Sequence, residues 1–426
     1  MNVEPAPLSY GQLSVWRDCR GLGRERWHEA NTKAVWGLGE PGVGDMEHEP
    51  AAVERAVRAL GHRHESLRTV YDLSDSYAPT QRVLPLEDAD AVLDGCVVEC
   101  RDEADFEQRV EQLAAEPFDL SAAPAWRFRV LTGRGRPVAV AVVKHHIMAD
   151  GWAEACLQSE FRTALAGGPA ASGAAAPPTP RELAAWQRSA GSRPRREVLL
   201  AHWERLFDLD AASLRPVGAA PEADTALQCT IRSPRALARA QELAKEHSLP
   251  VPGVVLAAFA WTVAHTAGTG PLVVQLMSAN RFVPPWSKVV SSTNQWAAAS
   301  LDPPADFVSY IRHIHAKSLS AYRQGMYDVD EVDALRDKTR AGRDPYEASL
   351  GFNYLSVAEV PVDAPAPEDG PTWQAPFSRI GHPCYLRATE EAGRCLDLRL
   401  RTLGLTEAVT TQVLEGTLAR LIDADG

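Results

Sequence analysis

Hydrophobic and polar positions follow two different periods along the chain, which predicts a mixture of helices and strands. Val53, Ala56, Val57 and Leu60 recur at helical spacing within 49–60, and this spacing predicts an amphipathic helix. Residues 137–144 form a short, continuous, β-branched run, which is typical of a strand buried on both faces. Similar patterns predict helices over 105–115, 152–165, 252–267, 307–322 and 406–422, and strands over 272–277, 348–354 and 395–402. Both halves of the chain are therefore predicted to be α/β.

A change in composition divides the chain before its middle. Residues 164–180 read ALAGGPAASGAAAPPTP, and such small residues and prolines neither bury a core nor continue a helix or strand. We expect an N-terminal lobe over 1–170, a linker over 171–180 and a C-terminal lobe over 181–426. A second loop, rich in Pro, Asp and Glu, is expected over 360–376.

Composition and charge exclude several classes of function. The 426 residues include 44 Lys and Arg against 56 Asp and Glu, a net charge of −12, and they contain no basic run of the kind that binds nucleic acid. No apolar run approaches the length of about 18 residues needed for a membrane span, and no secretory signal is visible. The seven cysteines are odd in number and form no CxxC pair, which argues against a disulfide framework or a zinc site. We expect a cytoplasmic protein with reduced thiols and no metal.

The clearest candidate for chemistry is the segment 144–151, which reads KHHIMADG between the predicted buried strand and a helix. Adjacent side chains of an extended segment point to opposite faces, so one of His145 and His146 can face a cleft while the other anchors inward. Histidine exchanges protons near neutral pH, which suits acyl transfer. Asp150 can stabilise the loop by pairing with an arginine. Gly151 allows close approach and presents an N–H at a helix start, where a tetrahedral oxyanion needs a donor.

A histidine pair alone is most often structural, so the spacing of the whole segment matters. The pattern HHxxxDG would arise by chance about once in a thousand chains of this length, from ordinary residue frequencies. The spacing therefore favours a functional site over satisfied core or loop residues.

With this motif the sequence resembles the condensation domains of nonribosomal peptide synthetases, in the chloramphenicol-acetyltransferase-like superfamily, whose signature is HHxxxDG. Four further segments resemble the family's elements in the same order: LSYGQLSVW at 8–16, HRHESLRT at 62–69, PRELAAWQR at 180–188 and SANR at 278–281. Three later segments depart from the family's patterns: VVSSTNQW at 289–296, MYDVDEV at 326–332 and GRDPY at 342–346. The resemblance implies two α/β lobes that form a V-shaped pseudo-dimer around a central tunnel.

Residue roles follow from the same resemblance. It implies that His146 is the active histidine with His145 beside it, that Asp150 is structural, and that Gly151 supplies a backbone amide. The arginine partner of Asp150 is expected to be Arg281, with Arg63 as the second candidate. The residues expected to line the substrate tunnel are Met148, Trp152, Ser292, Asn294 and Trp296.

The implied activity is transfer of a carrier-tethered acyl or aminoacyl thioester to an amine, which forms an amide in antibiotic-type peptide biosynthesis. An ester-forming or acyl-CoA-dependent acyltransferase of the same superfamily and a non-catalytic recruitment module remain as alternatives. No bound cofactor is expected, because the donor arrives on the phosphopantetheine of a carrier protein. The sequence carries no nucleotide-binding signature and no GGxS-like attachment site. We therefore expect a free-standing monomer that meets its carriers in trans.

Overall fold

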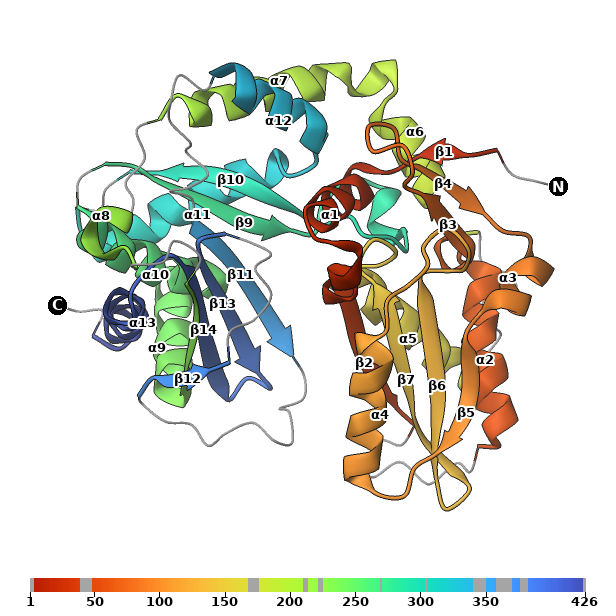
Figure 1. Cartoon of the computed structure of the whole chain (residues 1–426). Helices are drawn as coiled ribbons and strands as arrows, with labels where there is room; N and C mark the ends of the chain where they lie inside the picture. Colours follow the sequence, from red (N-terminus) through yellow and green to blue (C-terminus); the bar gives the residue numbers. More distant parts are fainter. Residues whose placement is uncertain are drawn as a thin grey trace. The chain divides into compact units, whose positions relative to one another are not determined.

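The structure is a computed structural model of the chain (Figure 1), which divides into two compact units. It describes residues 4–38, 48–167, 176–209, 214–220, 225–268, 270–302, 305–339, 350–357, 370–375 and 382–423. Unit 1 comprises Met1–Arg195 together with Ala279–Asn294, and unit 2 comprises Arg196–Ser278 together with Gln295–Gly426.

The division of the chain differs from the linker predicted at 171–180. Helix α6 (Pro180–Gln187) follows that linker in sequence but belongs to unit 1. One reason is that the backbone N–H of Tyr10 donates to Gln187 Oε1 at 2.9 Å, which ties the helix to the N-terminal segment. Residues 279–294 also belong to unit 1, although both strands that flank them lie in unit 2. The chain therefore returns once to its first unit after entering the second.

The main sheet of unit 1 carries the strand that precedes the histidine pair. Its order is β2-β7-β6-β5, with β2 at Asn31–Gly37, β7 at Arg136–His145, β6 at Trp126–Gly133 and β5 at Gly95–Glu99. Strands β5 and β6 are parallel, and the other neighbours are antiparallel. In Figure 1 the helices α2 (Pro50–Arg63) and α4 (Glu103–Ala115) flank this sheet, and α5 (Gly151–Leu165) follows β7.

Alternation along the strands assigns the helices of unit 1 to the two faces of this sheet. Trp36 of β2 packs on Phe161 of α5, with ring centroids 5.0 Å apart. On the other face, Val110 of α4 clusters with Leu131 of β6. Lys144 lies on the α5 face, where it forms an ion pair with Glu154, so its neighbour His145 is directed to the opposite face.

The remaining elements of unit 1 form a small second sheet and short helices. The sheet has the order β1-β4-β3, with β1 at Ala6–Pro7, β4 at Thr80–Val83 and β3 at Thr69–Asp72. The helices are α1 (Tyr10–Arg20) and α3 (Leu86–Val92), with 3₁₀ turns at Arg24–Ala30, Glu65–Arg68, Ala190–Ser192 and Trp286–Lys288. Ser9 and Gln12 form a capping box, which satisfies backbone N–H groups at the start of α1.

Unit 2 contains a larger sheet, which has seven strands among the described residues, in the order β10-β9-β11-β13-β14-β8-β12. These strands are β10 (Gln295–Leu301), β9 (Leu272–Ser278), β11 (Leu350–Val357), β13 (Cys384–Glu391), β14 (Cys395–Leu403), β8 (Ala226–Ser233) and β12 (Thr372–Gln374). Strand β11 is parallel to β9 and to β13, and the other neighbours are antiparallel.

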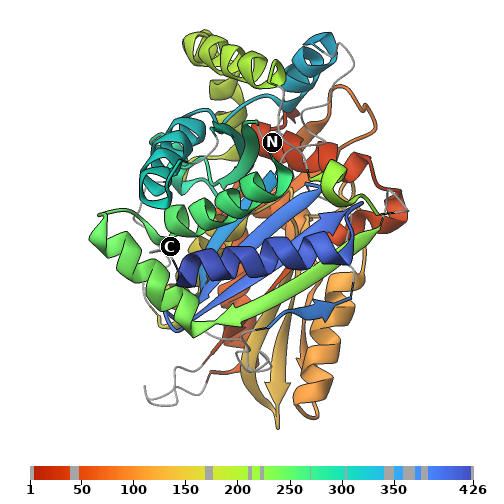
Figure 2. The same ribbon diagram turned by 90° about the vertical axis from the view of Figure 1, so that its left-hand side faces the viewer.

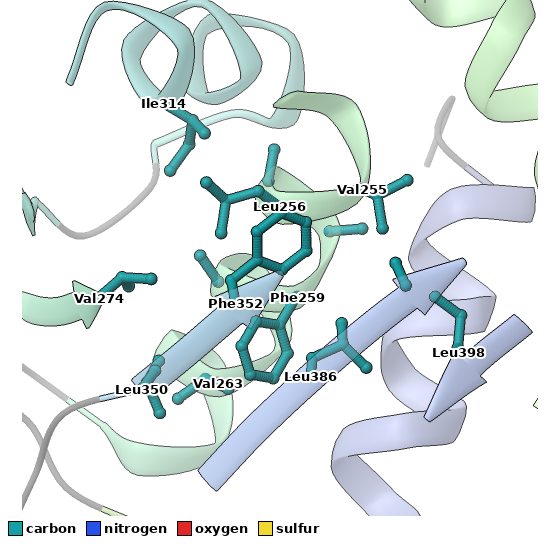
Figure 3. Packing of buried hydrophobic residues seen from close by; sticks show 14 of the residues in the cluster. Val255, Leu256, Phe259, Val263, Val274, Ile314, Leu350, Phe352, Leu386 and Leu398 are labelled. Carbon is teal, nitrogen blue, oxygen red and sulfur yellow. The ribbon is translucent and has the colours of Figure 1, made fainter. Parts of the chain in front are cut away.

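Helices cover one face of this sheet and bury the main hydrophobic core of unit 2. They are α9 (Pro234–Glu246), α10 (Val251–Ala267), α11 (Phe307–Arg323) and α13 (Glu407–Ile422), of which α9 and α13 lie across the sheet in Figure 2. Figure 3 shows Phe259 of α10 packed with Phe352, Leu386 and Leu398 from three strands. Because α10 is apolar on nearly all sides, its whole middle is buried in this core.

A second hydrophobic cluster in unit 2 lies around Trp203 of α7 (Arg193–Phe207). It includes Tyr327, whose ring centroid is 5.1 Å from that of Trp203, and Val332 of α12 (Val329–Thr339). A short helix, α8, spans Arg215–Gly218.

The predicted α/β class is confirmed, and each predicted helix and strand corresponds to an element with end shifts of a few residues. The apolar helix predicted at 252–267 is α10, and the buried strand predicted at 137–144 is β7. The V-shaped arrangement of the lobes and the tunnel between them stay predictions. Residues 171–175 and 342–346, and most of the second predicted loop, lie outside the described residues.

Within the described ranges, no single helix combines the length and apolarity needed to cross a membrane. Helices α9 and α10 meet the criterion only as a pair that is bent by 111°.

Candidate active site

The HHxxxDG segment forms the tight connection between β7 and α5 in unit 1. His145 is the last residue of β7, and the chain then turns, with Met148 N donating to His145 O at 3.0 Å. The backbone N–H of His146 donates to Ala30 O at 2.8 Å, which fixes the start of the turn against the segment before β2. Asp150 caps α5 by accepting a hydrogen bond from Ala153 N. Backbone contacts therefore hold both ends of the segment.

His145 is the histidine that anchors inward. Its side chain is buried, its Nδ1 accepts a hydrogen bond from Ile147 N at 3.2 Å, and its Nε2 lies 4.0 Å from Cys19 Sγ. Burial, with a smaller contribution from the neighbouring His146, lowers the pKa of His145 to about 3. The ring is therefore neutral at physiological pH.

His146 is only partly buried, which distinguishes it from its neighbour. Burial lowers the pKa of this ring below its usual value, and this effect outweighs the opposite influence of nearby backbone groups and of Asp150. Its Nδ1 is buried and makes no well-aligned hydrogen bond with a described residue. The ring is thus neutral near pH 7 and retains a free capacity for hydrogen bonding.

The predicted pair between Asp150 and Arg281 is present. Arg281 Nη2 donates to Asp150 Oδ1 at 2.8 Å and to Oδ2 at 2.9 Å, and both side chains are almost fully buried. Asp150 Oδ2 also accepts hydrogen bonds from Thr293 N at 2.9 Å and Thr293 Oγ1 at 3.0 Å. Charge-assisted bonds of this kind are the strong ones in a buried site, so Asp150 fixes the loop that carries His146.

Residues 279–294 form the other half of this arrangement. Arg281 donates to the carbonyl oxygens of Val289 at 2.5 Å and Ser291 at 3.0 Å, and Asn280 Nδ2 donates to Thr293 O at 2.9 Å. Asn280 has a φ of 53°, a left-handed conformation that asparagine tolerates better than most residues. The segment is therefore folded around the guanidinium that Asp150 binds.

Arg63, the second candidate for the partner of Asp150, has a different partner. Its Nε lies 3.1 Å from Glu160 Oε2 on α5, and the same carboxylate oxygen lies 2.8 Å from His64 Nε2. Arg63 and His64 thereby hold α5 through Glu160. The assignment of Arg63 to Asp150 is therefore wrong.

Gly151 stands at the first position of α5 and is exposed. A Cβ built on this residue would meet no atom within 4 Å, and the backbone conformation does not require glycine. Packing in this structure therefore leaves space beside the Cα of Gly151, at the helix start where partial positive charge accumulates.

The predicted tunnel residues occupy different environments. Met148 is fully buried, Trp152 is 55% exposed, and Ser292 is buried with its hydroxyl donating to Asn294 Oδ1 at 2.9 Å. Trp296 belongs to unit 2, where its ring packs against His382 and Tyr385. The full burial of Met148 fits a packing role in the turn, and a passage along the other four stays a prediction.

Two residues that matter for this geometry were not identified from the sequence. Thr293 lies in a segment that departs from the family's pattern, and no local signal marks it as a ligand of Asp150. Gly11 of α1 is the second, since a Cβ there would lie 2.5 Å from Ser292 O. Both roles depend on contacts between distant parts of the chain.

No group of three His, Cys, Asp or Glu residues in the described ranges is arranged to hold a metal ion. All seven cysteines lie in described residues and are free thiols.

A family model described as "Condensation domain" matches residues 44–364 of the chain. The chain belongs to the condensation-domain family. It is 28% identical over 290 residues to nonribosomal peptide synthetase kk1B from Curvularia clavata, which covers 64% of this chain. It is 26% identical over 343 residues to cyclosporin synthetase simA from Tolypocladium inflatum, which covers 75% of this chain. Each match spans only 2% of the relative's own length.

Solved condensation domains share the fold. A structure concerning condensation domain-mediated chain release from the enacyloxin polyketide synthase matches with a TM-score of 0.76 and 22% identity, over 99% of this chain and 84% of that one. The first condensation domain of the calcium-dependent antibiotic synthetase matches with a TM-score of 0.69 and 16% identity, over 99% and 97% of the two chains. The resemblance seen in the sequence is confirmed, and the relatives support a condensation function in peptide biosynthesis.

Proposed function

We propose that this condensation domain joins a carrier-tethered acyl or aminoacyl thioester to an amine, with His146 as the catalytic residue. The observation that carries the proposal is the partly buried, neutral ring of His146 on a loop that Asp150, Arg281 and Thr293 hold in place. A general base must be neutral and positioned before the substrate arrives. Both conditions are met here by burial and by the Asp150 hydrogen bonds.

The reaction can be written with these residues. The amine nitrogen attacks the thioester carbonyl carbon, so that a C–N bond forms and the C–S bond then breaks. His146 accepts the proton that the nitrogen loses and returns it to the departing thiolate. A proton on the buried Nδ1, beside neighbouring backbone groups, leaves Nε2 as the acceptor. The Gly151 N–H, at the open start of α5, stabilises the oxyanion of the tetrahedral intermediate.

The donor's phosphopantetheine arm is the only cofactor-like group that this proposal needs, and a carrier protein supplies it. We also propose that the carrier acts in trans, that the acceptor is a small molecule or a carrier-bound amine, and that the chain works as a cytoplasmic monomer. The family, whose relatives are peptide synthetases, supports the carrier as a partner, and the other three statements rest on the sequence.

The test is product formation from acyl and aminoacyl thioesters of a phosphopantetheinylated carrier protein, measured by mass spectrometry with a panel of amines. His146→Ala should lower the rate by about 10²–10⁴-fold, the usual contribution of a positioned general base. His247→Gln, at the end of α9 in unit 2, is the matched control and should leave the rate unchanged.

Two further comparisons distinguish amide formation from the alternative functions. Product from alcohols but not amines, or from acyl-CoA but not from the acyl carrier, would replace amide formation by the corresponding acyl transfer. Wild-type and His146→Ala rates that both equal the rate without protein would instead support a non-catalytic recruitment module.

A further inference from the structure

One face of the unit 2 sheet carries a concentration of positive charge. Arg387 of β13 lies directly opposite Arg399 of β14, and Arg401 lies directly opposite Tyr385. Side chains alternate along a strand, and Leu386 and Leu398 point into the helix-covered core in Figure 3. Arg387, Arg399 and Arg401 therefore share the opposite face. We call these three residues the arginine cluster.

One member of this cluster, Arg387, has no counter-charge among the described residues. Arg387 forms no hydrogen bond or ion pair with any described residue. Arg399 Nη2 lies 3.3 Å from Asp397 Oδ2, while Arg401 Nε donates to the neutral Gln228 Oε1 at 2.9 Å. Among the described residues the Arg387 guanidinium thus has no counter-charge, although the net charge of the chain is −12.

A second acid on this face, Glu391, cannot supply a counter-charge to Arg387. Glu391 is buried and already forms an ion pair with Arg232. Burial is the main cause that lowers the pKa of Arg401 to about 10, and the positive charges of Arg387 and Arg399 lower it further. The charged form of Arg401 is therefore less favourable here than in water. Like charges directly opposite each other destabilise a sheet, so this arrangement does not serve the fold.

The cluster is partly exposed and bordered by aromatic rings. The Arg399 side chain is 31% exposed, and Arg387 and Arg401 are also only partly buried. Tyr385 lies beneath the Arg401 guanidinium, 5.9 Å from ring centroid to Cζ, and its ring centroid is 5.6 Å from that of Trp296. A ligand on this face would therefore find cations next to an apolar surface.

We propose that the arginine cluster binds an oxyanion on a substrate, either the carboxylate of a small acceptor or the phosphate of a phosphopantetheine arm. Guanidinium groups match both groups geometrically, because their planar N–H forks bind two oxygens at once. The carbon skeleton of the ligand packs on Tyr385 and Trp296. That the oxyanion belongs to a substrate rests on the proposed function, whereas binding of the oxyanion does not.

The experiment is calorimetric titration of the full chain with two matched pairs of probes. The first pair is L-phenylalanine and L-phenylalaninamide, which differ in the carboxylate. The second is 4′-phosphopantetheine and pantetheine, which differ in the phosphate. The charged member of at least one pair should bind more tightly than its neutral partner, and the pair that responds identifies the source of the oxyanion.

Arg387→Gln is the decisive variant, since Arg387 has no partner in the fold to lose. It should weaken binding of the charged probe by about tenfold to a hundredfold, as expected for one charge-assisted bond. Its thermal midpoint should be equal to or above that of the wild type, because a repulsion is removed. Arg387→Lys should recover part of the affinity. Arg394→Gln, an exposed arginine in the turn between β13 and β14, is the matched control and should bind normally.

The inference is overturned if no charged probe binds at about 1 mM, the upper end of usual substrate affinities, or if Arg387→Gln leaves binding unchanged. Charged-probe binding that depends on Arg387 without any acyl transfer would overturn only the proposed function. Acyl transfer without such binding would overturn only this inference.

Discussion

Two charged sites, one in each unit, differ in whether the fold pairs their charges. In unit 1 the Asp150 and Arg281 side chains are 3% and 4% exposed, and the two charges are in direct contact. In unit 2 Arg387 has no partner among the described residues, although it lies directly opposite Arg399. A charge that the fold pairs is a structural element. A charge that the fold leaves unpaired is available to bind a ligand, which is what we propose for the arginine cluster.

The largest effect should follow from breaking the paired charge. Asp150→Ala leaves the buried Arg281 guanidinium without its carboxylate, which should lower the free energy of unfolding by about 3–5 kcal/mol and abolish acyl transfer. Urea unfolding and product formation measure the two effects. The double variant Asp150→Ala/Arg281→Met should regain part of the stability but not the activity. Unchanged stability of the single variant would refute the structural role of Asp150.

The next effect tests the packing that holds residues 279–294. A Cβ at Gly11 would lie 2.5 Å from Ser292 O and 2.6 Å from Thr293 Cα, both backbone atoms that cannot rotate away. Gly11→Ala should therefore destabilise the protein by about 1–3 kcal/mol and lower activity by displacing Thr293 from Asp150. Gly61→Ala on α2 is the matched control, because its nearest neighbour would be 4.0 Å away. Equal stability for the two variants would count against this contact.

A third effect concerns the pH dependence of stability. His145 has a pKa of about 3 in the folded state against an ordinary value of 6.5, so below pH 6.5 the unfolded state binds a proton that the folded state does not. Stability is fully present above this range and falls as the pH is lowered, by about 1.4 kcal/mol per pH unit from this group. His145→Gln should reduce the slope of unfolding free energy between pH 6 and about pH 4.5.

Burial lowers the pKa of His382 in unit 2 to about 4. This ring should therefore change the pH dependence of stability in the same direction, and His382→Gln extends the test to unit 2. Above pH 8 the stability difference between each variant and the wild type should not change with pH. A wild-type slope in His145→Gln would contradict the inward, neutral state of that ring.

The smallest effect on stability is expected at Trp152. Because the side chain is 55% exposed, Trp152→Ala should change the free energy of unfolding by less than about 0.5 kcal/mol. If the residue lines the predicted substrate path, KM should rise while the fold is unaffected. Trp373→Ala, a 41% exposed tryptophan of unit 2, is the control and should leave KM unchanged. An unchanged KM in Trp152→Ala would remove this residue from the path.

Local pattern was sufficient for the elements and for the central motif. The continuous β-branched run at 137–144 predicts β7, and the uniform apolar run predicts α10 as a buried helix. The motif also predicts part of the geometry of the site, because the end of a strand directs His145 and His146 to different environments. These features depend on neighbours within a few residues, which is why the sequence alone determined them.

Only the tertiary structure decided which distant residues meet. Asp150 and Arg281 are 131 positions apart, and the second arginine candidate, Arg63, was excluded only when Glu160 proved to be its partner. The arginine cluster has no sequence signature either, because it exists only when the register of β13 and β14 brings Arg387 opposite Arg399. Register and loop closure are set by the burial of whole sheets and helices, and no local stretch of sequence contains that information.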